Sequence, residues 1–291
     1  MINSILDYLS ISLVQNMFAA TLLACLLCGV VGTYVVVNRM VAVTGGIAHT
    51  TFGGVGFAYY MMSVFLVSWM TPMVGALIFG VVAAVIMVLC RRITDLRQDS
   101  VIGVLWSVGM ALGVIFIQFT DRSVVTPASF ETILFGNVLF VGTSTLYIMF
   151  AVGIAVLAIV AFLFRDLQIL TFDEVQARLS GIRVTVMNLI LYILIAVTCV
   201  LVANVVGIIM IIALMTIPVA TANLFTHSMK SLMALSTVLG MIMSVIGLFA
   251  ALALDTPPGA TVVLAVGAAF VLALIYHRLQ LRDAADEEAK A

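Results

Sequence analysis

The chain has 291 residues, of which 65% are hydrophobic and only 9% are charged, and its formal net charge is −1. A soluble domain contains roughly 45–50% apolar and about 25% charged residues. No water-soluble core could bury such an excess, so the composition excludes a soluble domain and predicts an integral membrane protein. The nearly neutral charge also gives no sign of a nucleic-acid partner, and we expect none.

Membrane-spanning helices are predicted where long stretches carry no Asp, Glu, Lys or Arg. Because a helix needs about 20 apolar residues to cross a bilayer, the charge-free stretches 40–90 and 184–229 are each long enough for two crossings. Thr71-Pro72 and Asn204 are the expected breaks within them. The sequence thus predicts an all-α bundle of eight or nine transmembrane helices that forms one domain, residues 1–291. The nine expected spans are 14–37, 42–68, 72–90, 100–119, 145–164, 184–203, 206–224, 231–253 and 260–277.

The basic residues predict the orientation of these spans. With the N-terminus outside, 11 of the 12 Lys and Arg residues fall in cytoplasmic loops, and Arg122 alone lies outside. The positive-inside rule therefore favours an outer N-terminus, a cytoplasmic C-terminus and a short charged cytoplasmic tail, 278–291, disordered at its end. Residues 120–144 then lie outside, and their apolar stretches predict short helices at, or dipping into, the outer face of the bilayer.

Motifs for catalysis are absent from the sequence. Neither of the two lysines, Lys230 and Lys290, follows a glycine, so the chain has no P-loop, and HExxH and GxSxG are also missing. Cys25 and Cys28 lie in an apolar helix, where a thiol pair is most often packing, and we assign the 17 methionines to core filling or lipid contact rather than to a soft metal. We expect no enzyme and no cofactor bound by this chain, and favour transport or a structural role.

The most unusual segment is 44–56, which contains five glycines and His49, the only histidine inside a predicted span. A histidine in a membrane is costly unless it faces a partner or water. The segment could line a substrate pathway in which the imidazole meets a cation. It could equally be a tightly packed glycine seam with a hydrogen-bonded histidine. The residues alone favour neither interpretation.

A second segment, 165–183, is predicted to be cytoplasmic. Thr171 and Glu174 predict a capping box for a short helix, and Gly181 is a plausible C-terminal stop. Four apolar side chains fall on one side of this helix: Phe172, Val175, Leu179 and Ile182. Such a helix can lie passively at the interface, which the residues alone favour, or it can dock in a groove of a partner protein.

Three acidic residues, Asp121, Glu131 and Asp255, are predicted on the outer face in addition to Asp7. They could gather cations at the mouth of a pathway. Ordinary solvated carboxylates would show the same pattern, and this interpretation is favoured.

Several of these segments together resemble the permease subunits of ABC importers for divalent metal ions, the zinc, manganese and iron family. The resemblance runs in order from about residue 14 to 275. Its seven segments are 29–40, the signature around His49, 99–105, 134–137, 171–181, 206–222 and 255–261.

The resemblance implies a permease in the inner or plasma membrane that works as two copies. Two cytoplasmic ABC ATPase subunits, which hold ATP and Mg, and an extracytoplasmic substrate-binding protein would complete the importer. It places a substrate pathway, with transient metal contact, at His49, Gly45, Thr50 and Asn137. It also implies an ATPase coupling segment at about 166–183. The coupling residues would be Phe172, Asp173, Glu174, Ala177, Leu179 and Gly181.

Two positions depart from the family pattern. The aspartate of the family signature, four residues before the histidine, is Gly45 here, and the aspartate of its LFGD motif is Asn137. An Asp and a His four residues apart share a helix face and could hold a metal together. Zinc, manganese or iron is therefore the leading class of substrate, but a chelated metal or another small solute stays open. A secondary transporter is disfavoured, since only one ionisable side chain lies within the spans.

Overall fold

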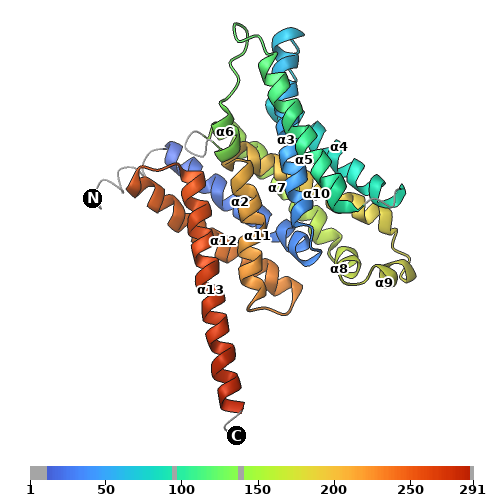
Figure 1. Ribbon diagram of the computed structural model, residues 1–291, viewed down its shortest axis with the longest axis vertical. Coiled ribbons are helices and arrows are strands. Elements are labelled where there is room, and N and C mark those ends of the chain that lie inside the picture. The colour runs from blue at the N-terminus through green and yellow to red at the C-terminus, as the bar shows by residue number, and fades with distance from the viewer. Residues whose placement is uncertain (1–11, 94–96, 137–140, 289–291) are drawn as a thin grey trace.

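The computed structural model describes residues 12–93, 97–136 and 141–288, and within these ranges its regular secondary structure is all helix, with no strand (Figure 1). The predicted all-α class is therefore confirmed. The helices are α2 (Ser12–Val37), α3 (Val41–Val64), α4 (Pro72–Ile93), α5 (Gln98–Gln118), α6 (Phe130–Phe135), α7 (Thr143–Phe162), α8 (Phe164–Phe172), α9 (Glu174–Leu179), α10 (Val184–Val206), α11 (Ile208–Asn223), α12 (Met229–Leu254) and α13 (Pro258–Glu288).

Seven of the described helices are long and apolar enough to cross a membrane: α2, α4, α5, α7, α10, α12 and α13. Two further helices correspond to the other predicted spans. The 24-residue α3 is long enough, but its glycines, threonines and His49 lower its hydropathy, and it is not among the seven. The 16-residue α11 is shorter than the roughly 20 residues of an ordinary crossing. The chain is thus a multi-pass membrane protein, with seven clear spans among the helices that the structure describes.

Several predicted boundaries need correction. Helix α3 ends at Val64 rather than at residue 68, and the chain between α10 and α11 breaks at Gly207 rather than at Asn204. Helix α13 continues beyond the predicted span end at residue 277, as far as Glu288, and the end of the charged tail lies outside the described residues. In the predicted outer region 120–144 the described residues hold one short helix, α6, and not several.

Gly207 breaks the helix because its backbone adopts a left-handed conformation, with φ of 87°. Gly136, at the end of α6, has φ of 77°, and L side chains rarely adopt either value. A Cβ atom at Gly207 would meet the Gly136 nitrogen, and a Cβ atom at Gly259 would meet the Phe135 oxygen. Three segments of the family resemblance therefore meet at one backbone junction between α6, the α10–α11 break and the start of α13.

Helix α3 lies between α4 and α5, and the three rise together to the top of Figure 1. Helix α10 packs against α4, while α2 packs against α11 and α12, and α13 covers α11 and α12. Most of α2 and α10 is buried, and both helices contribute heavily to the core. Helix α13 extends beyond the rest of the molecule at the bottom of the view.

The contact of α3 with its neighbours depends on glycine. A Cβ atom at Gly54 would overlap the carbonyl oxygen of Gly75 in α4, and one at Gly53 would lie 2.7 Å from the carbonyl oxygen of Gly109 in α5. Without side chains at these positions the helix backbones touch, which lets van der Waals packing hold helices together where the hydrophobic effect is weak. The glycine-seam interpretation of segment 44–56 is therefore correct as a description of its packing.

We predict that Gly54→Ala lowers the free energy of unfolding by about 1–3 kcal/mol, the cost of forcing extra atoms into a packed contact. The measurement is the thermal unfolding midpoint of the detergent-purified chain. Gly267→Ala in α13 is the control, since a Cβ atom there meets nothing within 4 Å. Equal midpoints for the two variants would contradict the backbone contact between α3 and α4.

Candidate functional site

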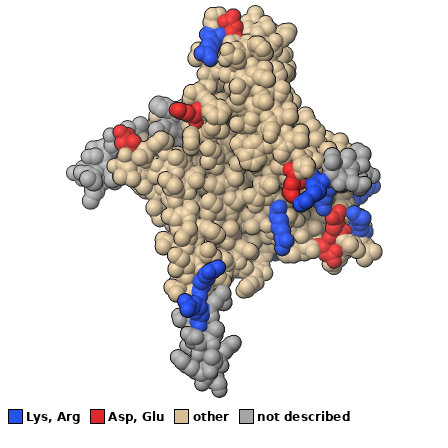
Figure 2. Space-filling model, in the orientation of Figure 1, with Lys and Arg blue, Asp and Glu red and all other residues tan. Residues whose placement is uncertain are grey.

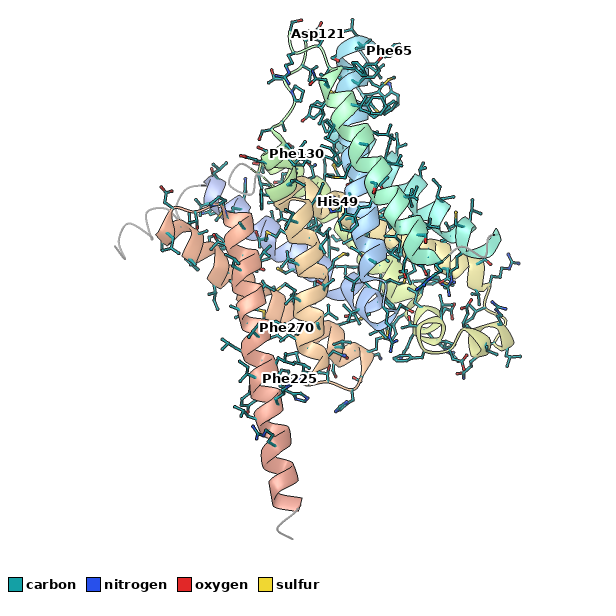
Figure 3. All side chains as sticks on the ribbon, in the orientation of Figure 1. His49, Phe65, Asp121, Phe130, Phe225 and Phe270 are labelled. Atoms are coloured by element: carbon teal, nitrogen blue, oxygen red, sulfur yellow. The ribbon has the colours of Figure 1, made fainter. Side chains whose placement is uncertain are left out.

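His49 lies two turns into α3 and close to the middle of the molecule (Figure 3). It is only 9% exposed, and its ring stacks on Trp106 of α5, with ring centroids 4.1 Å apart and an interplanar angle of 16°. Its Nδ1 atom lies 3.2 Å from the sulfur of Met110, which is one turn further along α5. An aromatic ring and a thioether therefore surround the imidazole on the α5 side.

Gly45 and Thr50 face α5 beside His49. A Cβ atom at Gly45 would lie 3.0 Å from the ring of Trp106, so this indole covers the position from which the family's aspartate would extend. The Thr50 hydroxyl lies 2.7 Å from the carbonyl oxygen of Gly46 and 3.1 Å from that of Leu105. A hydroxyl has a single hydrogen, so it donates to one of these oxygens at a time, and the hydrogen bond to Leu105 links α3 to α5. The predicted pathway role of Thr50 stays a prediction.

Trp106 and Met110 were missed in the sequence because both look like ordinary residues of an apolar span. A signal was present: the two are four residues apart and so share a helix face. They also follow the segment 99–105 that carries part of the family resemblance. What the sequence does not provide is the rotation of α5 that turns this face toward His49.

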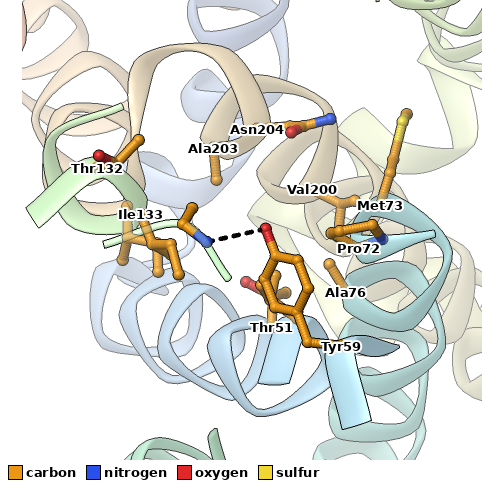
Figure 4. Close-up of a pocket in the computed structure, with 13 residues that line it drawn as sticks. Thr51, Tyr59, Pro72, Met73, Ala76, Thr132, Ile133, Val200, Ala203 and Asn204 are labelled. Atoms are coloured by element: carbon orange, nitrogen blue, oxygen red, sulfur yellow. Dashed lines mark hydrogen bonds between the residues drawn. The ribbon is translucent and has the colours of Figure 1, made fainter. Parts of the chain in front are cut away.

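A cavity of about 110 Å³ lies beside a different face of α3 (Figure 4). Thr51 lines it, and two residues along an α-helix separate the faces of His49 and Thr51 by about 200°. The hydroxyl of Tyr59 accepts a hydrogen bond of 3.3 Å from the backbone N–H of Ala128, which holds the loop before α6 over this cavity. The other lining residues come from α3, α4, α6, α10 and α11 and are mostly apolar: Val55, Pro72, Met73, Ala76, Thr132, Ile133, Val200, Ala203, Asn204 and Ile208.

The three predicted outer acidic residues do not form one cluster. Asp121 lies at the tip beyond α5 (Figure 3), whereas Glu131 is in α6 and Asp255 ends α12. Hydrogen bonds from the hydroxyl and backbone N–H of Ser123 lower the pKa of the Asp121 carboxyl, which keeps it ionised. That these three residues gather cations at a pathway mouth stays a prediction.

Asn137, a predicted pathway residue, lies outside the described residues, next to Gly136.

The predicted cytoplasmic segment forms two short helices, α8 and α9. The predicted capping box is wrong: Thr171 lies inside α8 and donates its hydroxyl hydrogen to the Leu167 carbonyl oxygen, at 2.7 Å. Asp173 caps α9 instead, accepting hydrogen bonds from the N–H groups of Val175 and Gln176 at 2.8 and 3.0 Å. An aspartate satisfies two N-terminal donors at once, which Thr171 cannot do from within a preceding helix.

Helix α9 is fixed to the body of the protein on one side and exposed on the other. Ala177 is fully buried, and Glu174 pairs with Arg91 at the end of α4 and with Arg178, each at 3.2 Å. Gly181 follows the helix with a φ of 80°, as its predicted role as a stop requires. Three apolar side chains of the segment point into solvent: Phe172 is 65% exposed, Val175 66% and Leu179 85%.

Comparisons with known proteins determine the family. Residues 10–277 match the ABC 3 transport family. The chain belongs to the ABC 3 transport family. It is 31% identical over 272 residues to a manganese transport system membrane protein, MntC, of Halalkalibacterium halodurans, covering 94% of this chain and 90% of that one. It is also 34% identical to an uncharacterized membrane protein of Synechocystis sp., with 96% and 95% of the two chains covered.

A solved structure agrees with this family assignment. It is described as PsaBC from Streptococcus pneumoniae in complex with Fab, and its matching chain is 30% identical, with a TM-score of 0.81 and coverage of 94% of this chain and 95% of that one. The resemblance stated from the sequence motifs is therefore confirmed for the family and for its multi-pass membrane character. The roles of individual ABC 3 residues in this chain stay predictions.

Proposed function

We propose that this chain is the permease subunit of an ATP-driven importer in the plasma membrane, with divalent metal ions such as manganese, zinc or iron as its substrates. The family assignment carries this proposal, together with the relatives that are named for manganese transport. His49 would lie on the metal's path, and a separate binding protein outside the cell would supply the high affinity.

ATP hydrolysis belongs to separate cytoplasmic subunits in this proposal, since the chain has no P-loop. Those subunits would hold ATP and Mg, and they would dock on α9 and on the end of α8. The exposed Phe172, Val175 and Leu179 supply the apolar contact, and the Glu174–Arg91 ion pair connects the docking surface to α4. Because α4 packs against α3, a push on α9 has a continuous route to the helix that carries His49.

The full arrangement would be a homodimer whose protomers each cross the bilayer nine times, with α3 and α11 added to the seven clear spans. The N-terminus would be outside and the C-terminus cytoplasmic. In Figure 2 basic side chains lie, together with acidic ones, around α8–α9 and on the lower part of α13, and a surface with no basic side chain in this view separates them from the charged tip beyond α5. That distribution supports this orientation.

An importer of a chelated metal or another small solute is the second candidate. The observation in its favour is Gly45, which leaves His49 without the family's carboxylate and with the indole of Trp106 in that direction. A transporter that needs no ATPase is disfavoured, because such carriers place several ionisable groups at mid-membrane.

We predict that Phe172→Ala combined with Leu179→Ala weakens binding of the cognate ATPase at least tenfold, since exposed apolar anchors of an interface each contribute about 1 kcal/mol or more. Copurification of the ATPase with the tagged permease is the measurement. Leu264→Ala in α13 is the control, because Leu264 is equally exposed, at 74%, but lies far from α9 in the chain. If the double variant copurified as much ATPase as the Leu264→Ala control, this segment would not be the docking surface.

The orientation is tested by labelling single cysteines in a background without Cys25, Cys28, Cys90 and Cys199. We expect Ser123→Cys to react with a membrane-impermeant maleimide on intact cells. Glu174→Cys should react only after the membrane is broken. Labelling of Glu174→Cys from outside would reverse the proposed topology.

A further inference from the structure

A pocket of about 130 Å³ lies where α9 meets the end of α4 and the start of α10. Two arginines, Arg91 and Arg178, line it, and the carboxylate of Glu174 lies between them. We propose that this pocket binds the phosphodiester headgroup of an anionic lipid, which holds α9 against the membrane helices. The inference adds a lipid ligand to the proposed importer, and it rests on the proposed orientation, which puts α9 on the cytoplasmic side.

The charges in the pocket favour an anion. Arg91 and Arg178 each lie 3.2 Å from a different oxygen of the Glu174 carboxylate. Among the described residues no other charged side chain lines the pocket, so one positive charge is left over. Each guanidinium carries several N–H donors in a planar fork, and donors remain on both arginines after these contacts. A phosphodiester has a single negative charge and several acceptor oxygens, which match the remaining charge and donors.

Uncharged polar groups of α10 face the same pocket. Tyr192 is almost fully buried, and its hydroxyl accepts a hydrogen bond of 2.7 Å from the side-chain amide of Gln98, so its own hydrogen can still be donated. Asn188 lies about one turn into α10, and its amide makes no hydrogen bond to another described residue. A polar side chain inside a membrane span is costly without a partner. An oxygen-rich ligand in the pocket would provide one.

The pocket lies at the depth of the lipid headgroups. Arg91 is the last residue of the apolar span in α4, and Val184 is the first residue of the span in α10. Leu89 and Val186, each next in sequence to a residue that lines the pocket, are 46% exposed and offer an apolar surface to acyl chains. Basic pockets between spans on the cytoplasmic side are typical sites for anionic headgroups. The start of α10, which has no side-chain cap, adds the positive end of a helix dipole.

The pocket and the apolar surface proposed for the ATPase lie on different sides of α9. Glu174 and Arg178 are four residues apart and share one side of the helix. Val175 and Leu179 each follow by one residue, so they lie about 100° further around it. A headgroup in the pocket therefore leaves the apolar side free for the ATPase. It also adds a second attachment of α9 to the membrane helices, besides the ion pair with Arg91.

Native mass spectrometry of the detergent-purified full chain measures the bound lipid directly. We would titrate the chain with phosphatidylglycerol, which is anionic, and with phosphatidylcholine, whose headgroup has no net charge. We expect one phosphatidylglycerol to bind about tenfold more tightly than phosphatidylcholine, because the surplus charge lies at the membrane surface. Arg178→Gln should weaken phosphatidylglycerol binding about fivefold by removing that charge, and Arg178→Lys, which keeps the charge, should restore most of it.

Arg165→Gln is the matched control. Arg165 is an exposed arginine of α8 that does not line the pocket. The substitution removes the same charge from the neighbouring helix, so it reports any general attraction of the basic surface for anionic lipid. We expect this variant to bind phosphatidylglycerol like the parent. Arg178 is also exposed, with 69% of its side chain accessible, so its substitution removes no buried contact.

Equal affinity for the two lipids, or unchanged phosphatidylglycerol binding in Arg178→Gln, would overturn the inference. Displacement of the lipid by inorganic phosphate at equal concentration would also overturn it, because the pocket would then be a site for a soluble anion. The import function is tested separately by ATP-dependent metal uptake in proteoliposomes with the partner subunits. Uptake without selective lipid binding would retain the importer and remove the lipid site. Selective lipid binding without uptake of any metal would retain the site and remove the importer.

Discussion

The direct backbone contact of α3 with α4 and α5 is the constraint on which the rest of the structure depends. Glycines at the crossings, such as Gly53 and Gly54, let carbonyl groups of the neighbouring helices occupy the space that a Cβ atom would need. In a bilayer this close approach supplies the packing energy that the hydrophobic effect supplies in water. It also fixes the rotation of α3, and so determines that His49 meets α5 while Thr51 lines a cavity beside another face.

The same rigidity connects α3 with α8 and α9, the helices that we propose lie on the cytoplasmic side. The Glu174–Arg91 ion pair is partly exposed and contributes little to stability on its own. The ion pair matters because it joins α9 to α4, and α4 packs against α3. A second rigid point lies at the junction of Gly136, Gly207 and Gly259, where left-handed backbone and close contact leave no room for side chains. Movement of α9 would therefore be transmitted by whole helices rather than absorbed by loops.

Composition and charge predicted the membrane class, the all-helical fold and most span positions, because these depend on the cost of burying polar groups in lipid. The predicted helix breaks and caps were wrong where tertiary contacts determine the local backbone. Asn204 looked like the break between α10 and α11, yet the positive φ is at Gly207; Thr171 looked like a cap, yet α8 continues past it to make Asp173 the cap. The neighbours of His49 could not be predicted, since the facing side of α5 depends on how two apolar helices are rotated against each other.

The central claim is that His49 lies on the path of an ATP-driven metal importer, and metal uptake by proteoliposomes containing the permease, its ATPase and its binding protein tests it most directly. The comparison is between the parent and His49→Ala, with His277→Ala, in the C-terminal half of α13, as the control histidine. We predict that His49→Ala loses most ATP-dependent uptake while it still folds and still copurifies with the ATPase. Uptake by His49→Ala at the parent rate would contradict the account and leave the imidazole as a packing residue.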